Sequence, residues 1–464
     1  MIVDISDSLR ALLESIFKGE DKTSCVWECE CTFLNPDGYE YKSRYVRDLT
    51  ITQMFLTSYM DTIQLVIDMR PTEQMELLKH IQNLSVGLVL YPVDNKSGNI
   101  IQDQEPIIFE AKVFLENQQD LEQKYGTGAF GNQETNTNQT PSQNEQQVPI
   151  TFHLITEFNH TVRQIGLNVI LNNVTMYDVV SWVAQQFNVL ALVMKPADNT
   201  TVYSSVIIPP MKYASDIFPY LQIKYGIYSK GLGYYFSNEK LYVYPLYGVD
   251  EDDAPEARTM QLVHAPENYF KGLTKYHKLV DNEVYIAATN KKDIRSLEAS
   301  GAENQGNTIV SLNADTLKDR FVNIGKDGKV TVDQTAITVI SQQNSATNTT
   351  SGMQNIKFTG ESTNIYNSTS DLASHNGKLL STTWSRAVPW LLPPGMHVEY
   401  SFDYYNKDTN TYEFTTRKGT LLNVSYMCQV QPATNSQVPW LTFTAAMQFF
   451  IEPDHKSDDD FQYN

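Results

Sequence analysis

The chain has 464 residues, which is enough for about three domains and for cores that need no disulfide or metal support. Hydrophobic residues make up 41% of it and charged residues 19%, a globular composition, and the 27 Tyr and 20 Phe favour β-rich structure. Because 54 acidic residues outnumber 35 basic ones and no basic patch stands out, the net charge of −19 argues against sequence-specific nucleic acid binding.

The sequence also predicts where the chain is made. Its strongest apolar runs, such as Val189 to Met194, are far shorter than the ~20 residues of a spanning helix, so we expect no membrane insertion. The N-terminus has no basic segment followed by an apolar core and a cleavage site. Four Cys do not make a disulfide framework, and we therefore expect a protein made and kept in a cytoplasm.

Residues 1–116 are predicted to form an N-terminal β unit that opens with a helix. Asp4 or Ser6 can cap this helix, and Gly19 can end it. Its apolar stripe must be covered either by this chain's own core or by a neighbouring subunit, and the pattern leaves both possibilities open. The stripe consists of Leu9, Leu12, Leu13, Ile16 and Phe17.

Apolar residues then alternate with a period of two, which predicts strands. One face of the first strand consists of Cys25, Trp27, Cys29, Cys31 and Phe33. The turn Asn35-Pro-Asp-Gly38 returns the chain as a hairpin. A short helix over residues 72–81 is expected to place Met75, Leu78 and Ile81 on one face. Further strands are expected over residues 51–55, 62–69, 86–91 and 107–115.

Residues 117–147 are predicted to be a linker or a long loop. Of these 31 residues, 13 are Asn or Gln, and too little apolar surface is present to offset the entropy of ordering them.

Residues 148–250 carry a mixed α/β pattern. Thr175 can cap a helix that runs to Phe187, and Ser215 can cap a second helix that ends at Tyr225-Gly226. A hairpin of aromatic strands follows, with its turn over Ser237 to Lys240. Strands are expected over residues 150–158, 164–171, 189–194, 206–208, 233–236 and 241–244.

The remaining chain is predicted to be β-rich with polar insertions. Residues 251–376 hold two or three strands within 261–289 and weaker ones at 321–324 and 329–332. Residues 377–455 hold C-terminal strands, and residues 456–464 form an acidic tail. The C-terminal strands are expected over residues 397–405, 412–416, 421–430 and 440–451.

Four patterns that resemble chemical sites are better explained by structure. Gly126-Thr-Gly128-Ala-Phe-Gly131 matches a dinucleotide-binding motif but lacks the strand and helix that the motif needs. The Cys-rich strand has the pattern of a core face, and only Cys428 could complete a metal site with it. His153 and His160 should face opposite sides of a strand, and Asp250 to Asp253 should be a solvated turn. We therefore predict no catalytic, cofactor-binding or metal-ligating residue, no cofactor and no enzymatic activity.

Two segments resemble bacteriophage tail hub proteins. The first runs from Ile207 through a helix ending in Tyr225-Gly226 into Gly231-Leu-Gly-Tyr-Tyr-Phe236. The second is Leu391-Leu-Pro-Pro-Gly395 with the strands that follow it, which is similar to the baseplate hub of contractile-tailed phages. The resemblance implies a β-rich α+β fold, with two tail-tube-like antiparallel β-barrel or sandwich domains and a smaller mixed α/β domain between them.

The resemblance also implies a function. Such a hub is a structural virion protein of the tail baseplate, assembled in the host cytoplasm as a homotrimer, that adapts a sixfold tail tube to a trimeric spike. Its implied partners are the tail tube, central spike, tape measure and wedge or peripheral baseplate proteins, with DNA only in transit. The acidic charge would keep a channel from gripping phosphate, although ordinary solubility explains it equally well.

Other functions stay open at this stage. The chain could be the hub of a phage-tail-like secretion or injection device, or another tail-tip adaptor. It could also be a cell-wall glycan hydrolase, because a catalytic carboxylate pair is defined by spatial rather than sequence spacing. Loss of peptidoglycan turbidity on adding the purified protein would identify the hydrolase.

We expect residues 117–147 to be a surface excursion from the core. Limited proteolysis should cut there first, and deleting the Gln/Asn-rich tip should leave folding intact, since loop length changes closure entropy only slowly. Resistance to cleavage throughout this stretch would contradict the prediction.

Overall fold

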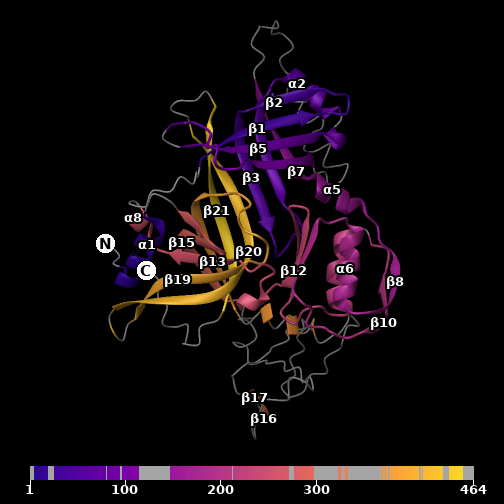
Figure 1. Ribbon diagram of the computed structural model, residues 1–464, viewed down its shortest axis with the longest axis vertical. Coiled ribbons are helices and arrows are strands. Elements are labelled where there is room, and N and C mark those ends of the chain that lie inside the picture. The colour runs from indigo at the N-terminus through magenta and orange to yellow at the C-terminus, as the bar shows by residue number, and fades with distance from the viewer. Residues whose placement is uncertain are drawn as a thin grey trace, which may run out of the picture.

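A computed structural model describes most of the chain outside its longest polar segments (Figure 1). The predicted loop 117–147, except its last residue, lies outside the described residues, as do Cys25, the acidic tail 456–464 and most of residues 297–376. The described residues are 5–18, 26–79, 81–94, 97–113, 147–211, 213–270, 276–296, 322–324, 330–332, 366, 369–370, 373–374, 377–406, 409, 411–431 and 438–452.

Strands dominate the described residues, which confirms the β-rich α+β class. The helices are α1 (Asp7–Phe17), α2 (Pro71–Leu78), α5 (Glu157–Gln164), α6 (Met176–Gln186), α7 (Ile217–Lys224) and α8 (Glu267–Phe270). The strands are β1 (Trp27–Leu34), β2 (Glu40–Ser43), β3 (Val46–Met54), β4 (Thr62–Met69), β5 (Ser85–Pro92), β6 (Ile107–Val113), β7 (Val148–Thr156), β8 (Val169–Val174), β9 (Ala191–Met194), β10 (Tyr203–Ile208), β11 (Leu232–Ser237), β12 (Lys240–Pro245), β13 (Thr259–His264), β14 (His277–Val280), β15 (Glu283–Ser296), β16 (Val322–Ile324), β17 (Val330–Val332), β18 (Lys378–Ala387), β19 (His397–Asn406), β20 (Thr411–Gln431) and β21 (Trp440–Ile451).

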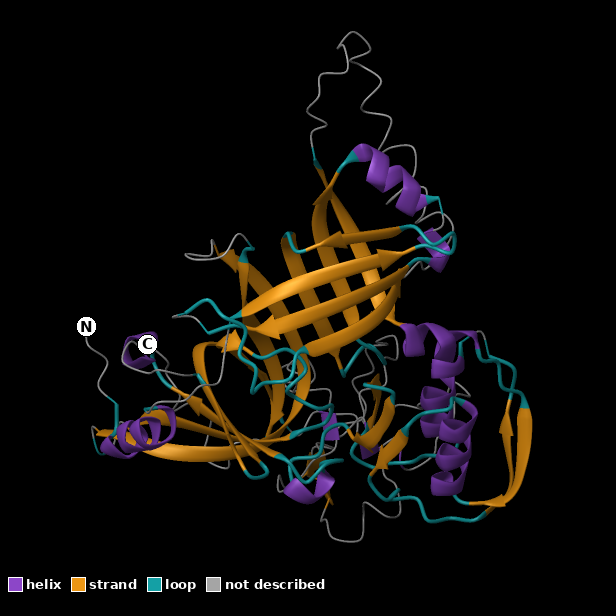
Figure 2. Ribbon diagram, turned by 45° about the horizontal axis from the view of Figure 1, so that its top comes forward, coloured by secondary structure: helices purple, strands orange, loops and turns teal. Residues whose placement is uncertain are grey.

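The largest sheet closes on itself twice, so it forms two barrels (Figures 1 and 2). The first barrel has the strand order β20-β3-β4-β7-β6-β5-β1-β21, and the pairing of β20 with β21 closes it. The second barrel has the order β19-β20-β21-β18-β15-β13, and the pairing of β13 with β19 closes it. The two long strands β20 and β21 therefore belong to both barrels.

Different halves of β20 serve the two barrels. Residues 411–420 pair with β19 of the second barrel, and residues 423–427 pair with β3 of the first. A bulge between Leu421 and Asn423 separates these halves. Because the bulge shifts the side-chain alternation by one residue, Leu421 and Val424 both point into the barrel core, and Leu422 points to the opposite face.

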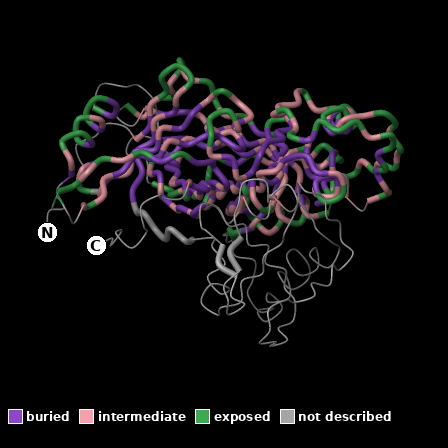
Figure 3. Tube along the Cα trace, turned by 90° about the horizontal axis from the view of Figure 1, so that it is seen from below, coloured by how far each residue is buried: buried purple, intermediate pink, exposed green. Residues whose placement is uncertain are grey.

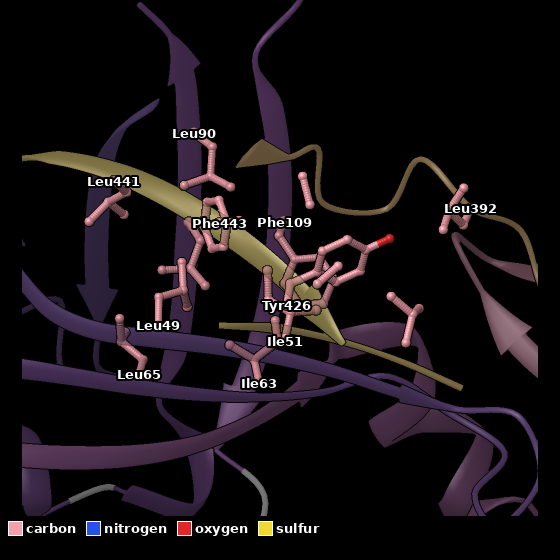
Figure 4. Close-up of a cluster of buried hydrophobic side chains, with 14 of the residues drawn as sticks. Leu49, Ile51, Ile63, Leu65, Leu90, Phe109, Leu392, Tyr426, Leu441 and Phe443 are labelled. Carbon is pink, nitrogen blue, oxygen red and sulfur yellow. The ribbon is translucent and has the colours of Figure 1, made fainter. Parts of the chain in front are cut away.

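The interior of the first barrel is apolar, as the period-two alternation predicts. Trp27, Cys29, Cys31 and Phe33 are buried along one face of β1. Figure 4 shows side chains of β3 and β4 meeting those of β20 and β21 in one cluster. In space, the buried positions lie together in the interior of the described part of the molecule, and exposed positions lie around them (Figure 3).

The mixed α/β unit lies beside the barrels and has its own core. Helix α6 buries Val179, Val180 and Val183 against α7 and a small sheet of order β11-β12-β9. Thr175 caps α6 as predicted, since its side chain accepts from the amide of Asp178. A two-stranded ribbon of β8 and β10 covers another side of the same core.

The sequence left open whether helix α1 packs against its own chain or against a neighbouring subunit. Its apolar stripe packs within the same chain, on the outer face of the second barrel, against Val263, Phe270 and Ala287. Ser6 caps the helix, and its backbone amide and hydroxyl also donate to Asp403 of β19 at 2.6 and 2.7 Å. The helix therefore precedes the first barrel in sequence but belongs to the second in space.

Several sequence expectations were wrong in detail. The strand expected over residues 150–158 ends at Thr156, because Thr156 caps α5 by accepting from the amide of Asn159. Helix α5 runs to Gln164, so the strand expected over residues 164–171 begins only at Val169, as β8. Helix α7 has no side-chain cap at its first turn, where Ser215 had been expected. Met75 is 56% exposed, and Leu77 is the buried residue of α2.

The C-terminal strands also differ from expectation. Residues 412–416 and 421–430 form one strand, β20, because Gly419 continues the ladder instead of breaking it. Strand β18, with buried Leu380 and Trp384, was not predicted, since Ser and Thr fill its alternate positions. The sheets are not purely antiparallel either, because β13 runs parallel to both β15 and β19. The predicted domain limits stay predictions.

We expect Gly419 to be essential for the shared strands. A Cβ there would stand 2.2 Å from the carbonyl oxygen of Phe450 and 2.6 Å from Ile451 Cδ1. Gly419→Ala should therefore lower the free energy of unfolding in urea by about 1–3 kcal/mol. Gly166→Ala is the control, because nothing lies within 4 Å of its Cβ position. Equal effects of the two substitutions would contradict the prediction.

Candidate functional site at the three-way junction

The two segments that resemble phage hub proteins meet at one place in the structure. Gly395, which ends the second segment, has φ of +67°, and a Cβ there would lie 2.5 Å from the ring of Tyr244 in β12. Gly233 of the first segment leaves room for the same ring, since its Cβ would also lie 2.5 Å from it. The glycines of both segments therefore allow Tyr244 to wedge between the α/β unit and the barrels.

Buried amide side chains hold the first segment in shape. Asn199 is 1% exposed, and its Nδ2 donates to the carbonyls of Tyr225 and Gly226 at 3.0 and 2.9 Å. Gln222 accepts from the amide of Ile227 at 2.9 Å and donates to the carbonyl of Tyr228 at 2.8 Å. These side chains fix the Tyr-Gly turn together with the backbone cap of α7, in which the amide of Gly226 donates to the carbonyl of Leu221 at 2.9 Å, and the turn therefore has a structural role.

Strand β12 joins the α/β unit to the shared strands. Leu241 and Val243 face the α/β core, whereas Tyr242 and Tyr244 pack with Leu422 and Phe450 of β20 and β21. Both faces of this strand are covered within the same chain. Strand β21 buries one face in the barrel core, and on its other face Trp440 and Phe450 are buried whereas Ala446 is exposed.

The predicted solvated turn, Asp250 to Asp253, is tied to this junction. It forms a short 3₁₀ helix, and Lys230 bonds to Asp250 and Asp253 at 3.3 and 2.7 Å. Nearby, the hydroxyl of Thr420 donates to the carbonyl of Gly248. These contacts attach the end of the α/β unit to β20.

Asp61 is the most unusual residue of the junction, because its carboxyl group is fully buried. It receives hydrogen bonds from Gln53 Nε2 of the first barrel at 2.9 Å and from Trp390 Nε1, between β18 and β19, at 3.1 Å. Ser237 Oγ of β11 lies 3.5 Å from its Oδ2. Burial raises the pKa of Asp61 to about 6, although the neutral polar side chains around it partly oppose this shift.

The backbone on two sides of Asp61 is unusual: it is strained at Trp390, and it is hydrogen-bonded between two units near Tyr59. Trp390 has φ of +56°, a left-handed conformation that costs a bulky residue about 1–3 kcal/mol. Its ring stacks on Phe109 at 4.8 Å between centroids, which helps to hold it. On the other side, the amide of Phe236 donates to the carbonyl of Tyr59 at 2.8 Å. Barrel and α/β backbone are therefore joined beside the carboxyl group.

The described residues that had suggested other chemistry lie in the β-rich core or on separate elements. Cys29 and Cys31 are buried thiols whose Sγ atoms lie 3.7 Å apart, and Cys428 accepts from the amide of Leu49 at 3.0 Å. Gly126 to Gly131 lies outside the described residues. His153 and His160 do not share a strand, since His153 is in β7 and His160 is in α5.

The described residues contain no group of three or more His, Cys, Asp or Glu side chains that could hold a metal ion. None of the helices in the described ranges is both long and apolar enough to cross a membrane. No sequence signal pointed to Asp61, Gln53 or Trp390, because their importance comes from the meeting of segments far apart in the chain.

The fold defines a class of protein with two β-barrels on one shared pair of strands and an α/β unit docked against them. The sequence then gives the family. Residues 12–284, more than half of the chain, match the family model of the Bacteriophage PBS1 gene 109 protein. The chain belongs to this bacteriophage family, which confirms the phage part of the resemblance. No curated protein matches the sequence.

Solved structures with a similar arrangement share little sequence with this chain. A tail protein from Neisseria meningitidis MC58 has a TM-score of 0.39 at 12% identity, covering 91% of this chain and 96% of that one. The 43 kDa tail protein of prophage MuSo2 from Shewanella oneidensis has 0.36 at 9%, covering 91% and 98%. A chain of the phage p2 virion baseplate has 0.30 at 8%, covering 92% and 100%. Scores this low assign no role.

Gly395→Ala should destabilise the protein more than a positive φ alone can explain. Ala in the left-handed conformation costs about 1–2 kcal/mol, and the collision with Tyr244 should add about 1–3 kcal/mol. Gly38→Ala is the matched control, since Gly38 has φ of +82° and nothing within 4 Å of its Cβ position. Urea unfolding of both variants measures the difference, and equal losses would show that Tyr244 does not depend on this glycine.

Proposed function

We propose that this protein is a structural component of the phage tail that forms the central hub of the baseplate as a homotrimer. In this role it adapts the sixfold tail tube to a trimeric spike and surrounds the channel for the tape measure protein and DNA. Its partners are the tube, spike, tape measure and neighbouring baseplate proteins, its location is the virion, and its assembly takes place in the host cytoplasm.

The observation that carries the proposal is the presence of two barrels in one chain. Three copies related by a threefold axis would present six barrels, and a ring of six barrels can meet a sixfold tube on one side while keeping threefold symmetry on the other. Membership of a bacteriophage family and the two hub-like segments support the same role. The net charge of −19 suits a channel that must not bind DNA.

We also propose that the protein is not an enzyme. Three buried polar side chains of the junction hold the chain's own segments together. Asn199 and Gln222 bond to backbone groups of one turn, and Asp61 bonds to side chains of neighbouring strands. A peptidoglycan turbidity assay with the purified protein should show no loss, and a loss would contradict this part of the proposal.

The hub proposal predicts a trimer. Native mass spectrometry of the purified chain should give three times the monomer mass, and electron microscopy should show a ring with a central opening. Tube and spike proteins, added separately, should bind to opposite faces of that ring. A stable monomer that binds neither partner would overturn the proposal.

A surface variant sharpens this experiment. Strand β13 pairs with β19 only as far as Ser401, so the end of the β19–β20 hairpin extends beyond β13. The aromatic residues at this end, Tyr405, Tyr412 and Phe414, are about two-fifths exposed. If copies meet there, Tyr412→Asp should reduce the trimer fraction without lowering monomer stability, because an exposed side chain contributes little to folding. Tyr177→Asp is the control, since Tyr177 is 50% exposed on α6 of the α/β unit.

A further inference from the structure

One carboxyl group contacts three parts of the molecule. Asp61 directly precedes β4 of the first barrel and receives hydrogen bonds from Gln53, in β3 of the same barrel, and from Trp390, in the β18–β19 connection of the second barrel. Ser237, at the end of β11, brings the α/β unit to the same group. A change at Asp61 therefore acts on all three contacts at once.

The described groups that face Asp61 supply no positive charge. Gln53 from β3, Ser237 from β11 and Trp390 from the β18–β19 connection are neutral. The titratable groups that face it from β11, β12 and β20 are the phenols Tyr235, Tyr242 and Tyr426; burial above all, with the charge of Asp61 adding to it, raises the pKa of each. Beyond Tyr242 stand Glu256, which accepts from its hydroxyl at 3.0 Å, and Arg258.

Burial favours the neutral acid at Asp61 and is the larger effect, whereas the hydrogen-bond donors around it favour the carboxylate. A buried carboxylate without a cation is costly, whereas a protonated carboxyl group needs only one acceptor for its proton. Gln53 offers one, because it is 1% exposed and its Oε1 has no hydrogen-bond partner among the described residues. Rotating the Gln53 amide turns this oxygen towards Asp61 Oδ1, from which its Nε2 now lies 2.9 Å.

We propose that Asp61 is a proton-controlled latch. As a neutral acid it holds the α/β unit against the two barrels, and on losing its proton to solvent it loosens this three-way contact. The open junction lets water reach the carboxylate, and the strained Trp390 then leaves its left-handed conformation. This proposal is independent of the hub function, since it concerns a contact within one chain.

The direction of the pH dependence follows from the raised pKa of Asp61 in the closed junction. Burial raises the pKa of Asp61 from 3.8 to about 6, so the closed junction binds a proton more tightly than the open one. Its contribution to stability is complete below pH 3.8 and is lost as the pH rises through about 6. Across that window the equilibrium constant for opening should rise on the order of a hundredfold.

Hydrogen exchange at pH 5 and pH 8, corrected for the intrinsic exchange rates, tests the latch. In the full-length protein, β11 and residues 388–396 should lose protection at pH 8, and α6 should serve as an internal reference. Asp61→Asn should remove this difference, because the amide does not ionise. Asp68→Asn should behave like the wild type, since Asp68 lies in β4, the strand that Asp61 precedes, in an exposed ion pair with Arg47 at 3.3 Å.

Infrared titration of the acid carbonyl band gives a second readout. The band of a buried protonated carboxyl group should disappear with a midpoint near pH 6 in the wild type and be missing in Asp61→Asn. If that variant does not fold, Trp390→Phe replaces it. Loss of the indole donor should raise the midpoint, because this donor lowers the pKa of Asp61. An unchanged midpoint, or the same pH-dependent exchange in Asp61→Asn, would overturn the proposal.

Discussion

The pairing of β20 with β21 is the interaction on which the rest of the structure depends. It closes the first barrel, forms one wall of the second, and presents Leu422 and Phe450 to the α/β unit. A single pair of strands can do this because β20 is 21 residues long and changes its neighbours at the bulge. The barrels are therefore joined by hydrogen-bonded backbone, which resists bending far more than a flexible linker would.

Local sequence patterns predicted much of the fold. The alternation in Trp27, Cys29 and Cys31 correctly identified a strand face, and Thr175 correctly identified the start of α6. Predictions failed where a local signal competed with tertiary contacts. Gly419 looks like a strand end, but the close carbonyl of Phe450 is the reason for a glycine in mid-strand.

The junction could be predicted only in part. The segments that contain Gly226 and Gly395 were identified by their resemblance to a family, and both glycines allow an aromatic ring to pack closely against the backbone. Asp61 could not be found, because a single acidic residue before a strand has no distinctive pattern. Its burial arises from Ser237 and Trp390, which lie 176 and 329 residues further along the chain.

The shared strands also determine when the first barrel can form during synthesis. Its strands β1 to β7 are complete at Thr156, but β20 begins only at Thr411. At about 5–20 residues per second, the ribosome takes roughly 10–50 seconds to make the chain between them. Throughout this interval the edges of β1 and β3 lack their final partners, and an unpaired edge invites association with other chains. Newly made protein is thus exposed to aggregation until β20 and β21 emerge, so a chaperone that shields strand edges would raise its yield.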